Sequence, residues 1–305
     1  MVEFTVPLDT PFSLEYTLVS GQLFRWERRG DWWIGVVEGS VLKVRQEGDV
    51  LRCSSGFDHL DSAFVGRYFR LEVDLDHVLA SLSKDEAITR AAEKYYGLRI
   101  VSQDAWECLA SFVLATNANI PRIRKMVSAI CLRYGEPFEF EGESYAAFPK
   151  PEVLADAKEA DLLSCGLGYR APFLKQVARV MMREEVDFAR IKSLGYEDAR
   201  KLLVSELLGQ KLLLGVGPKV ADCILLYSCG KDEAFPIDVW IARVLAKDYP
   251  RILGPTFRKR LAAHGRIKLS PSDYYGISRR ARAYFGSYAG YAQQYLYIAA
   301  REEIL

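Results

Sequence analysis

The feature that most constrains the fold of this chain is a change of hydrophobic pattern near residue 75. Residues 31–54 alternate short β-branched and aromatic runs with turns at Glu38-Gly39 and Glu47-Gly48-Asp49, a pattern typical of an antiparallel meander. Farther along, hydrophobic residues recur at helical spacing in segments such as "SKDEAITRAAEKYYG" and "YEDARKLLVSELLG". We therefore predict an α+β fold, with an N-terminal antiparallel β-sheet domain over residues 1–75 and a larger all-helical body over residues 76–305.

The composition is that of an ordinary globular protein, since half of the 305 residues are hydrophobic and 27% are charged. No segment approaches the roughly 18 consecutive apolar residues of a membrane helix. The first residues lack the basic start and apolar core of a secretory signal, so we expect an intracellular protein. The six cysteines form no C-x-x-C pair, which disfavours zinc and iron–sulfur sites and predicts buried, reduced thiols.

The net charge of +1 does not by itself indicate nucleic-acid binding, but the basic residues are unevenly distributed. Residues 117–133 contain four Lys or Arg and no acid, and residues 251–285 contain nine Lys or Arg against one acid, Asp273. Basic clusters on a near-neutral protein are typical of a polyanion site, although either cluster could equally be a solvated helix face.

The stretch "KLLLGVGPK", residues 211–219, predicts a tight hairpin between two helices. Gly215 and Gly217 allow the backbone conformations of the turn and leave amide N–H groups bare, and Pro218 suits the first position of the second helix. Bare amides at the positive end of a helix can bind one DNA phosphate without recognising the base sequence. This helix–hairpin–helix pattern indicates DNA binding, but many non-catalytic proteins carry it.

Lys219 follows in the first turn of that helix, and Asp238 begins the next helix in "FPIDV". Lys219 could simply contact a phosphate, and Asp238 could simply cap its helix. However, a partly desolvated lysine near a helix N-terminus is expected to favour its neutral form, a nucleophile that forms Schiff bases. A carboxylate beside it could stabilise positive charge on a sugar ring. The pair therefore favours a glycosylase of the lyase type over a simple DNA-binding protein.

Five motifs occur in order over nearly the whole chain: "SGQLFRW", "QDAWECLASFVLATNANIPRI", "GLGYRA", "GVGPKVADC" with "FPIDV", and "YAGYAQ". Together they resemble the helix–hairpin–helix superfamily of DNA glycosylases, and within it the 8-oxoguanine DNA glycosylases of eukaryotic type and their prokaryotic relatives. The resemblance implies two helical subdomains with a cleft between them in residues 76–305. It also implies a bifunctional repair enzyme that flips out 8-oxoguanine opposite cytosine and excises it through a Schiff base on Lys219, with Asp238 as the matching carboxylate. Strand cleavage by β-elimination is expected to follow. The missing four-cysteine cluster disfavours the endonuclease III and adenine-glycosylase branches.

The same resemblance assigns the residues that bind the damaged base. The carbonyl of Gly21 is expected to accept the N7 hydrogen that distinguishes 8-oxoguanine from guanine, and Gln293 to bind the Watson–Crick edge. Cys223 and Tyr297 are expected to sandwich the base between them. Considered without the family, Cys223, Gln293 and Tyr297 would be interpreted as helix core.

Other residues are assigned to the DNA around the flipped base. Asn117 is expected to fill the vacated space, and Tyr169 to wedge beside it. Arg122 and Arg170 are expected to hold the orphaned cytosine, because their guanidinium donors suit its O2 and N3 acceptors. This arrangement predicts a preference for lesions opposite cytosine.

Three positions depart from the family pattern. Ala118 replaces the middle asparagine of the commoner "NNN", Trp240 stands where eukaryotic members have a phosphate-contacting histidine, and Tyr297 replaces the usual phenylalanine and adds a hydroxyl. None of them alters the pair formed by Lys219 and Asp238.

Two alternatives stay open: an alkylated-purine DNA glycosylase of the same superfamily, and a non-catalytic helix–hairpin–helix DNA-binding protein. We expect no required cofactor and no metal site built from side chains; a structural monovalent or calcium ion could bind at the hairpin. We expect a monomer without membrane contact that acts on double-stranded DNA containing 8-oxoguanine. The expected location is the cytoplasm, with the nucleoid, in a prokaryote, or the nucleus in a eukaryote.

Overall fold

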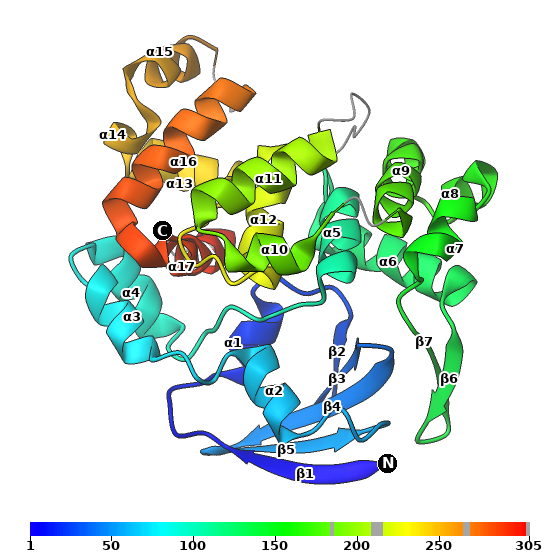
Figure 1. Ribbon diagram of the computed structural model, residues 1–305. Helices are drawn as coiled ribbons and strands as arrows, with labels where there is room; N and C mark the ends of the chain where they lie inside the picture. The colour runs from blue at the N-terminus through cyan, green and yellow to red at the C-terminus, as the bar shows by residue number, and fades with distance from the viewer. Residues whose placement is uncertain (184–185, 209–215, 265–268, 303–305) are drawn as a thin grey trace.

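The computed structural model describes residues 1–183, 186–208, 216–264 and 269–302. Its N-terminal part is a five-stranded antiparallel sheet of strand order β1-β5-β4-β3-β2, at the bottom of Figure 1. The strands are β1 (Val2–Pro7), β2 (Trp26–Arg29), β3 (Trp32–Val37), β4 (Ser40–Glu47) and β5 (Val50–Ser55). The predicted sheet is confirmed, and the predicted turns join β3 to β4 and β4 to β5.

The helices α1 (Leu14–Val19) and α2 (Ser62–Phe69) complete the core of the sheet domain around Trp26. The Trp26 ring is 1% exposed, and its indole N–H donates a hydrogen bond to the Tyr68 hydroxyl at 3.0 Å. Gly35 on the neighbouring strand makes room for this ring, because a Cβ atom there would lie 2.4 Å from it. This packing anchors β2, the strand that follows the "SGQ" loop.

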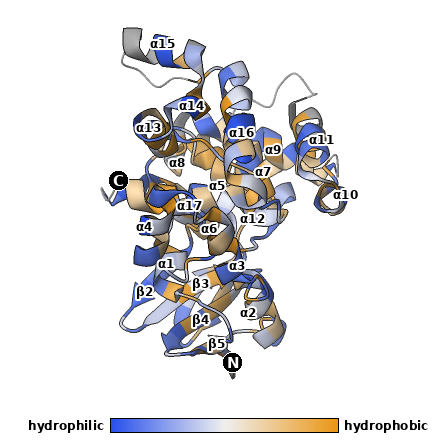
Figure 2. Cartoon of the chain, turned by 90° about the vertical axis from the view of Figure 1, so that its left-hand side faces the viewer, coloured by the Kyte–Doolittle hydropathy of each residue, from blue (hydrophilic) through white to orange (hydrophobic). Residues whose placement is uncertain are grey.

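The rest of the chain is mainly helical and surrounds a second, larger core. Its helices are α3 (Leu75–Leu82), α4 (Glu86–Lys94), α5 (Ala105–Leu114), α6 (Ile120–Tyr134), α7 (Pro151–Asp156), α8 (Glu159–Ser164), α9 (Ala171–Met182), α10 (Phe188–Ser193), α11 (Tyr196–Leu208), α12 (Pro218–Ser228), α13 (Val239–Lys247), α14 (Pro250–Leu253), α15 (Pro255–His264), α16 (Pro271–Phe285) and α17 (Ala289–Arg301), with short 3-10 turns at Gly168–Arg170 and Gly286–Tyr288. Figure 2 shows hydrophobic residues concentrated on central helices such as α5. The predicted helical body is confirmed.

One element of the body was not predicted by helical periodicity, the hairpin of β6 (Pro137–Phe140) and β7 (Glu143–Ala146). Phe140 packs with Val36 and Val41 of the sheet domain. The hairpin therefore joins the two parts of the molecule through a small apolar cluster of its own.

The boundary between the two parts stays a proposal. A division after residue 75 assigns Leu75 to the sheet domain, but Leu75 belongs to the larger core, and Val101 packs into the core of the sheet domain. All six cysteines are free and buried, which confirms the predicted thiols. In the part of the chain that the structure describes, no helix is long and apolar enough to cross a membrane.

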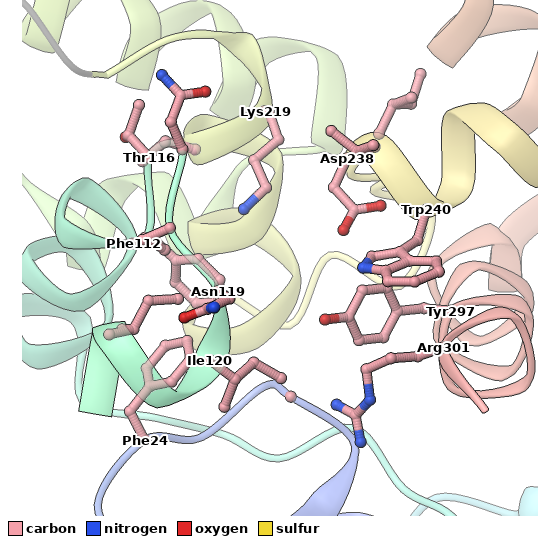
Figure 3. Close-up of a pocket in the computed structure, with 18 of the residues that line it drawn as sticks. Phe24, Phe112, Thr116, Asn119, Ile120, Lys219, Asp238, Trp240, Tyr297 and Arg301 are labelled. Carbon is pink, nitrogen blue, oxygen red and sulfur yellow. The ribbon is translucent and has the colours of Figure 1, made fainter. Parts of the chain in front are cut away.

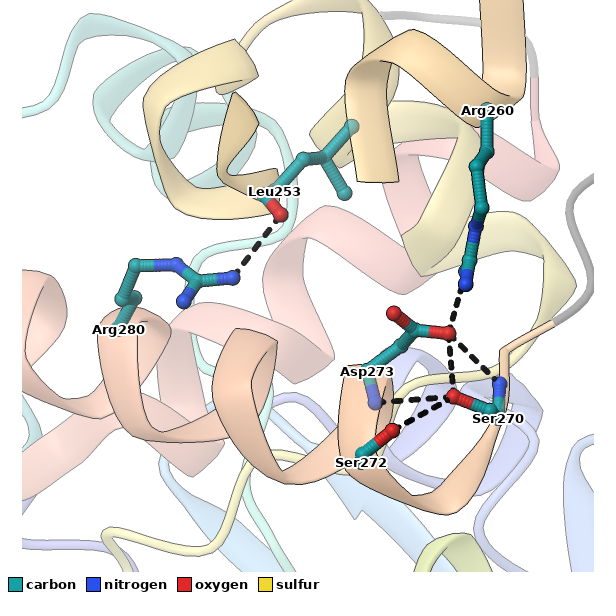
Figure 4. A network of polar contacts seen from close by, with 6 residues as sticks. All are labelled: Leu253, Arg260, Ser270, Ser272, Asp273 and Arg280. Carbon is teal, nitrogen blue, oxygen red and sulfur yellow. Dashed lines mark hydrogen bonds and ion pairs between the residues drawn. The ribbon is translucent and has the colours of Figure 1, made fainter. Parts of the chain in front are cut away.

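A polar network at the start of α16 ties this helix to α15 (Figure 4). Ser270 Oγ accepts a hydrogen bond from the Asp273 N–H at 3.2 Å, and the Asp273 carboxylate accepts one from the Ser270 N–H at 3.0 Å, a reciprocal capping box. Arg260 of α15 forms an ion pair with the same carboxylate. The one acid of the basic stretch is thus used as a cap, and it fixes the chain directly after Leu269, which lines the cavity described next.

Candidate active site

A cavity of about 1000 Å³ lies where the sheet domain meets the helical body. The N-terminal residues of α6, α12 and α13 meet at it, among them Asn119, Gly217 and Val239. Each helix start carries partial positive charge, so their convergence favours an anionic ligand. Among the described residues, the charged ones on its walls are Arg124, Lys219, Asp238 and Arg301. With three cations and one acid, the cavity suits a polyanion such as DNA.

Lys219 lies in the first turn of α12 and points its amine into the cavity (Figure 3). Its Nζ atom lies 4.9 Å from the centre of the Phe112 ring, within cation–π range. Burial lowers the pKa of Lys219, but the sulfur of Cys223 and the Asp238 carboxylate outweigh it, and the pKa lies above its ordinary value. The expectation that the neutral amine is favoured is therefore wrong. Lys219 is an ammonium that must lose a proton before it can act as a nucleophile.

Asp238 faces Lys219 across the cavity from the N-cap of α13 (Figure 3). Its Oδ1 accepts a hydrogen bond from the Ile241 N–H at 2.8 Å, so the capping role is confirmed. Burial raises the pKa of Asp238 above its ordinary value, although the Ile241 hydrogen bond and Lys219 oppose this shift. Within the described ranges, Lys219 and Asp238 form no direct ion pair, so a substrate group can lie between them.

Gly21 forms part of the opposite wall with a φ of 84°, a conformation that favours glycine, and a Cβ atom there would lie 2.9 Å from the Tyr297 ring. Two buried glutamines hold its loop: Gln22 Nε2 donates to Ser20 Oγ at 2.9 Å, and Gln294 Nε2 donates to the Ser20 carbonyl at 2.8 Å. No hydrogen bond among the described residues uses the Gly21 carbonyl. Two hydrogen bonds thus hold the loop at Ser20, and the Gly21 carbonyl has no partner within the described residues. A role for these two glutamines was not predicted from the sequence. A polar amide side chain among apolar residues was the feature that could have indicated it.

A smaller space of about 50 Å³ lies beside Lys219, and the four predicted base-binding residues all line it: Gly21, Cys223, Gln293 and Tyr297. It has room for one or two water molecules at roughly 30 Å³ each, but not for a purine. Tyr297 lines both this space and the large cavity, so a shift of its ring would join them. Gln293 is 3% exposed, and its Oε1 has no hydrogen-bond partner among the described residues. Since such an acceptor costs roughly 1–3 kcal/mol, this atom is suited to a donor from a ligand.

A second cluster lies at the edge of the cavity, on the loop between α5 and α6. Asn117 has a φ of 51° and is exposed, and its amide donates to the Tyr169 hydroxyl at 3.2 Å. Arg170 is 1% exposed and donates to the carbonyls of Thr116 at 2.8 Å and of Asn117 at 3.0 Å. The structure brings Asn117 and Tyr169 together at the surface, but it uses Arg170 as a support beneath their loop. Contact with an orphaned cytosine would require Arg170 to leave these carbonyls.

The remaining predicted DNA-binding residues are Arg122, Gly217 and Gly215, and the structure describes the first two. Arg122 is exposed on the first turn of α6, and Gly217 is the N-cap of α12. Gly215 and the backbone of the predicted ion site lie outside the described residues. Ala118 and Trp240, two of the departures from the family pattern, line the large cavity. Among the described residues, no group of three or more His, Cys, Asp or Glu side chains could hold a metal ion.

A buried network behind Lys219 and Asp238 was not predicted from the sequence. The carboxylate of Asp222, on α12, accepts a hydrogen bond from the Tyr274 hydroxyl at 2.8 Å and pairs with Arg200 at 3.3 Å. The Tyr274 hydroxyl in turn accepts a hydrogen bond from the Ile237 N–H at 3.2 Å, directly before Asp238. The network therefore fixes the start of α13 relative to the helix that carries the lysine.

Comparison with known proteins agrees with this geometry. Residues 110–253 match the HhH-GPD superfamily of base excision DNA repair proteins, and residues 5–109 match the N-terminal domain of 8-oxoguanine DNA glycosylase. A probable N-glycosylase/DNA lyase of Methanothermobacter thermautotrophicus is 33% identical over 95% of this chain and 94% of its own length. The N-glycosylase/DNA lyase of Saccharomyces cerevisiae is 30% identical over 93% of this chain and 82% of its own.

A solved structure is similar as well. The crystal structure of Clostridium acetobutylicum 8-oxoguanine glycosylase/lyase in complex with double-stranded DNA containing cytosine opposite 8-oxoG is 30% identical, with a TM-score of 0.81 over 96% of this chain and 93% of that one. Fold and site together thus define a helix–hairpin–helix protein of base excision repair. More narrowly, the chain belongs to the 8-oxoguanine DNA glycosylase family of N-glycosylase/DNA lyases. The predicted family is confirmed.

Proposed function

We propose that this chain is a bifunctional DNA repair enzyme that excises 8-oxoguanine opposite cytosine and then cleaves the strand at the abasic site. The observation that supports this most directly is the position of Lys219 and Asp238 on one cavity, beside a buried pocket with two open acceptors. These acceptors are the Gly21 carbonyl and Gln293 Oε1. Guanine presents an acceptor at N7 and 8-oxoguanine a donor, so a rigid carbonyl favours the damaged base.

In the proposed reaction, Lys219 loses its proton and its Nζ attacks C1′ of the extruded nucleotide. The bond between C1′ and the base nitrogen breaks, and the base leaves with the electron pair and takes up the proton that Lys219 released. Asp238 stabilises the positive charge that develops on the sugar ring. The adduct opens to a Schiff base, and loss of a proton from C2′ then expels the 3′ phosphate. Strand cleavage thus follows from the same lysine.

The partner is double-stranded DNA, held at several points. Asn117 and Tyr169 enter the gap left by the base, and Arg122 with Arg170 binds the orphaned cytosine. The hairpin amides at Gly215 and Gly217, together with the start of α12, bind one backbone phosphate. We propose that the enzyme acts as a monomer without a required cofactor, with an optional structural ion at the hairpin. It acts where the chromosome is, in the cytoplasm of a prokaryote or the nucleus of a eukaryote.

The test is borohydride trapping on a duplex with one 8-oxoguanine opposite cytosine, comparing the wild type with Lys219→Gln. We expect a covalent adduct and a cleaved strand only with the wild type. A duplex with guanine at the same position controls for the lesion. Arg52→Gln, which changes an exposed residue of the sheet, controls for substitution in general.

Each of the other possible outcomes would contradict one part of the proposal. Base release without an adduct would contradict the lyase role of Lys219. Adducts of equal yield opposite adenine would contradict the role of Arg122 and Arg170. If the wild type releases 3-methyladenine but leaves 8-oxoguanine in place, the alkylated-purine alternative is correct.

A further inference from the structure

A pair of arginines lines the cavity at a distance from the proposed chemistry. Arg124 comes from the second turn of α6, and Arg301 is the last residue of α17. Neither belongs to the lysine–aspartate pair or to the residues that contact the base. They nevertheless supply two of the three cations among the described residues of the cavity wall.

Arg301 is held in place by two contacts. Its Nη2 donates a hydrogen bond to the Val19 carbonyl at 2.8 Å, and its guanidinium carbon lies 5.8 Å from the centre of the Tyr297 ring. Figure 3 shows the guanidinium on the side of the Tyr297 ring that faces away from Trp240. Because a guanidinium carries five N–H donors, these contacts leave donors for a ligand.

Arg124 carries a donor that is not satisfied within the described residues, since its Nε is buried without a hydrogen-bond partner. Burial lowers the pKa of Arg124, Glu27 opposes this shift, and Arg301 adds to it. Arg124 and Arg301 line the same cavity, so both positive charges face one space. Glu27 does not neutralise them, because its carboxylate is exposed and lies 3.6 Å from Arg29. An anion in this space would be attracted by both guanidinium groups.

We infer that Arg124 and Arg301 bind a backbone phosphate of the damaged strand, next to the extruded nucleotide. This inference rests on the proposed function, in which the cavity receives a flipped nucleotide. Such a nucleotide has a phosphate on each side, and the hairpin with the start of α12 accounts for one of them. Two guanidinium groups match the oxygens of the other, because arginine binds phosphate through paired donors. A neutral base edge would leave both positive charges on the cavity wall without a counter-charge.

The test measures how salt weakens binding to a duplex with a tetrahydrofuran abasic analogue, which lacks a base and is not cleaved. Each neutralised phosphate contributes about 0.9 to the slope of log Kd against log salt concentration. We expect the double variant, Arg124→Gln with Arg301→Gln, to lower the slope by about 0.9. Each single variant should lower it by less, because the remaining arginine still neutralises the shared phosphate.

Two control variants separate phosphate binding from other effects. Arg52→Gln should leave the slope unchanged, and Arg301→Lys should keep it because the charge remains. If Arg301→Gln slows excision while the slope and the affinity for the abasic duplex stay at wild-type values, Arg301 acts only by positioning Tyr297 and the inference is wrong. If each single variant lowers the slope by about 0.9 and the double variant by about twice as much, the arginines contact separate phosphates and the shared site is wrong.

A failure of the proposed function gives a different result. If the wild type binds the abasic duplex no more tightly than an intact one, the cavity does not receive a flipped nucleotide. That outcome overturns the proposed function, and this inference with it. A normal preference for the abasic duplex with an unchanged slope in the double variant overturns the inference alone.

Discussion

Gly21 and Asn117 both have a left-handed backbone on the wall of one cavity, but their surroundings are opposite. Gly21 is enclosed, with the Tyr297 ring against it and its loop held by Gln294 from the far end of the chain. Asn117 is exposed, and Arg170 supports its carbonyl from beneath. The comparison indicates that the base-recognition side is built into the protein core, whereas the side that faces the DNA gap is built on the surface. Changes on the first side should affect stability and activity together, and changes on the second should affect activity alone.

The largest effect on excision is expected for a substitution of Asp238, which belongs to neither of the two sides. Asp238→Asn removes the carboxylate but keeps a good N-cap, so excision should fall by about 10²–10³-fold while the helix remains capped. Because burial raises its pKa, the folded protein favours neutral Asp238, and ionisation as pH rises through that pKa removes stability. The neutral asparagine should therefore be at least as stable as the wild type at neutral pH. Single-turnover excision and thermal unfolding measure the two effects.

The pH profile provides a second measurement on the same variant. The proposed active form of Asp238 is the carboxylate, so wild-type activity should be lost as pH falls through a pKa above that of an ordinary aspartate. Asp238→Asn should lack this acid limb. An identical acid limb in both proteins would assign it to another group.

On the enclosed side, Gly21→Ala should reduce both stability and activity. An alanine at this φ is strained by about 1–3 kcal/mol, and its Cβ would push against the Tyr297 ring. We expect a lower Tm and a loss of 8-oxoguanine excision of about 10–100-fold, since 1.4 kcal/mol corresponds to a factor of ten. Binding of the abasic duplex, which needs no base pocket, should change by less than about threefold. Normal excision by a destabilised variant would show that Gly21 serves the fold only.

How much of these two sides could be predicted from the sequence depends on how far apart along the chain the contacting residues lie. Lys219 and Asp238 lie in short motifs whose helix starts are encoded locally, and both were predicted. The support of Gly21 depends on Gln294, which lies 274 residues from its partner Ser20, and no local pattern encodes that contact. The same holds for Arg170, whose sequence context predicts a DNA contact but whose donors bind a carbonyl 54 residues away. The raised pKa of Lys219 depends on Cys223, one turn along its own helix, and on the Asp238 carboxylate from another helix. Residue types were therefore predictable, and their burial and charge state were not.

The exposed side is tested by Asn117→Gly, which introduces a glycine at a left-handed position, whereas Gly21→Ala removes one. Glycine accepts the left-handed backbone, so stability should stay within about 0.5 kcal/mol of the wild type. Excision should fall by about tenfold, because the side chain proposed to fill the DNA gap is gone. Thermal unfolding and single-turnover excision, run beside Gly21→Ala, test the comparison directly. A large drop in Tm would show that Asn117 is as much a part of the core as Gly21.

The smallest effect is expected for Tyr297→Phe, which removes only the hydroxyl that distinguishes this chain from the usual family pattern. The ring that packs on Gly21 remains, so the stacking face and the wall of the base pocket are unchanged. Arg301 lies beside the Tyr297 ring and acts electrostatically on its hydroxyl, and loss of one such polar contact costs no more than about 0.5–1.5 kcal/mol. Excision should therefore stay within about threefold of the wild type, and the salt dependence of binding should not change, because Arg301 keeps its charge and its contact with Val19. Tyr297→Ala, which also removes the ring, should lose excision as strongly as Gly21→Ala. If the phenylalanine variant instead matches the alanine variant, the hydroxyl itself takes part in base recognition, and the enclosed side contains a polar contact that the usual family pattern does not have.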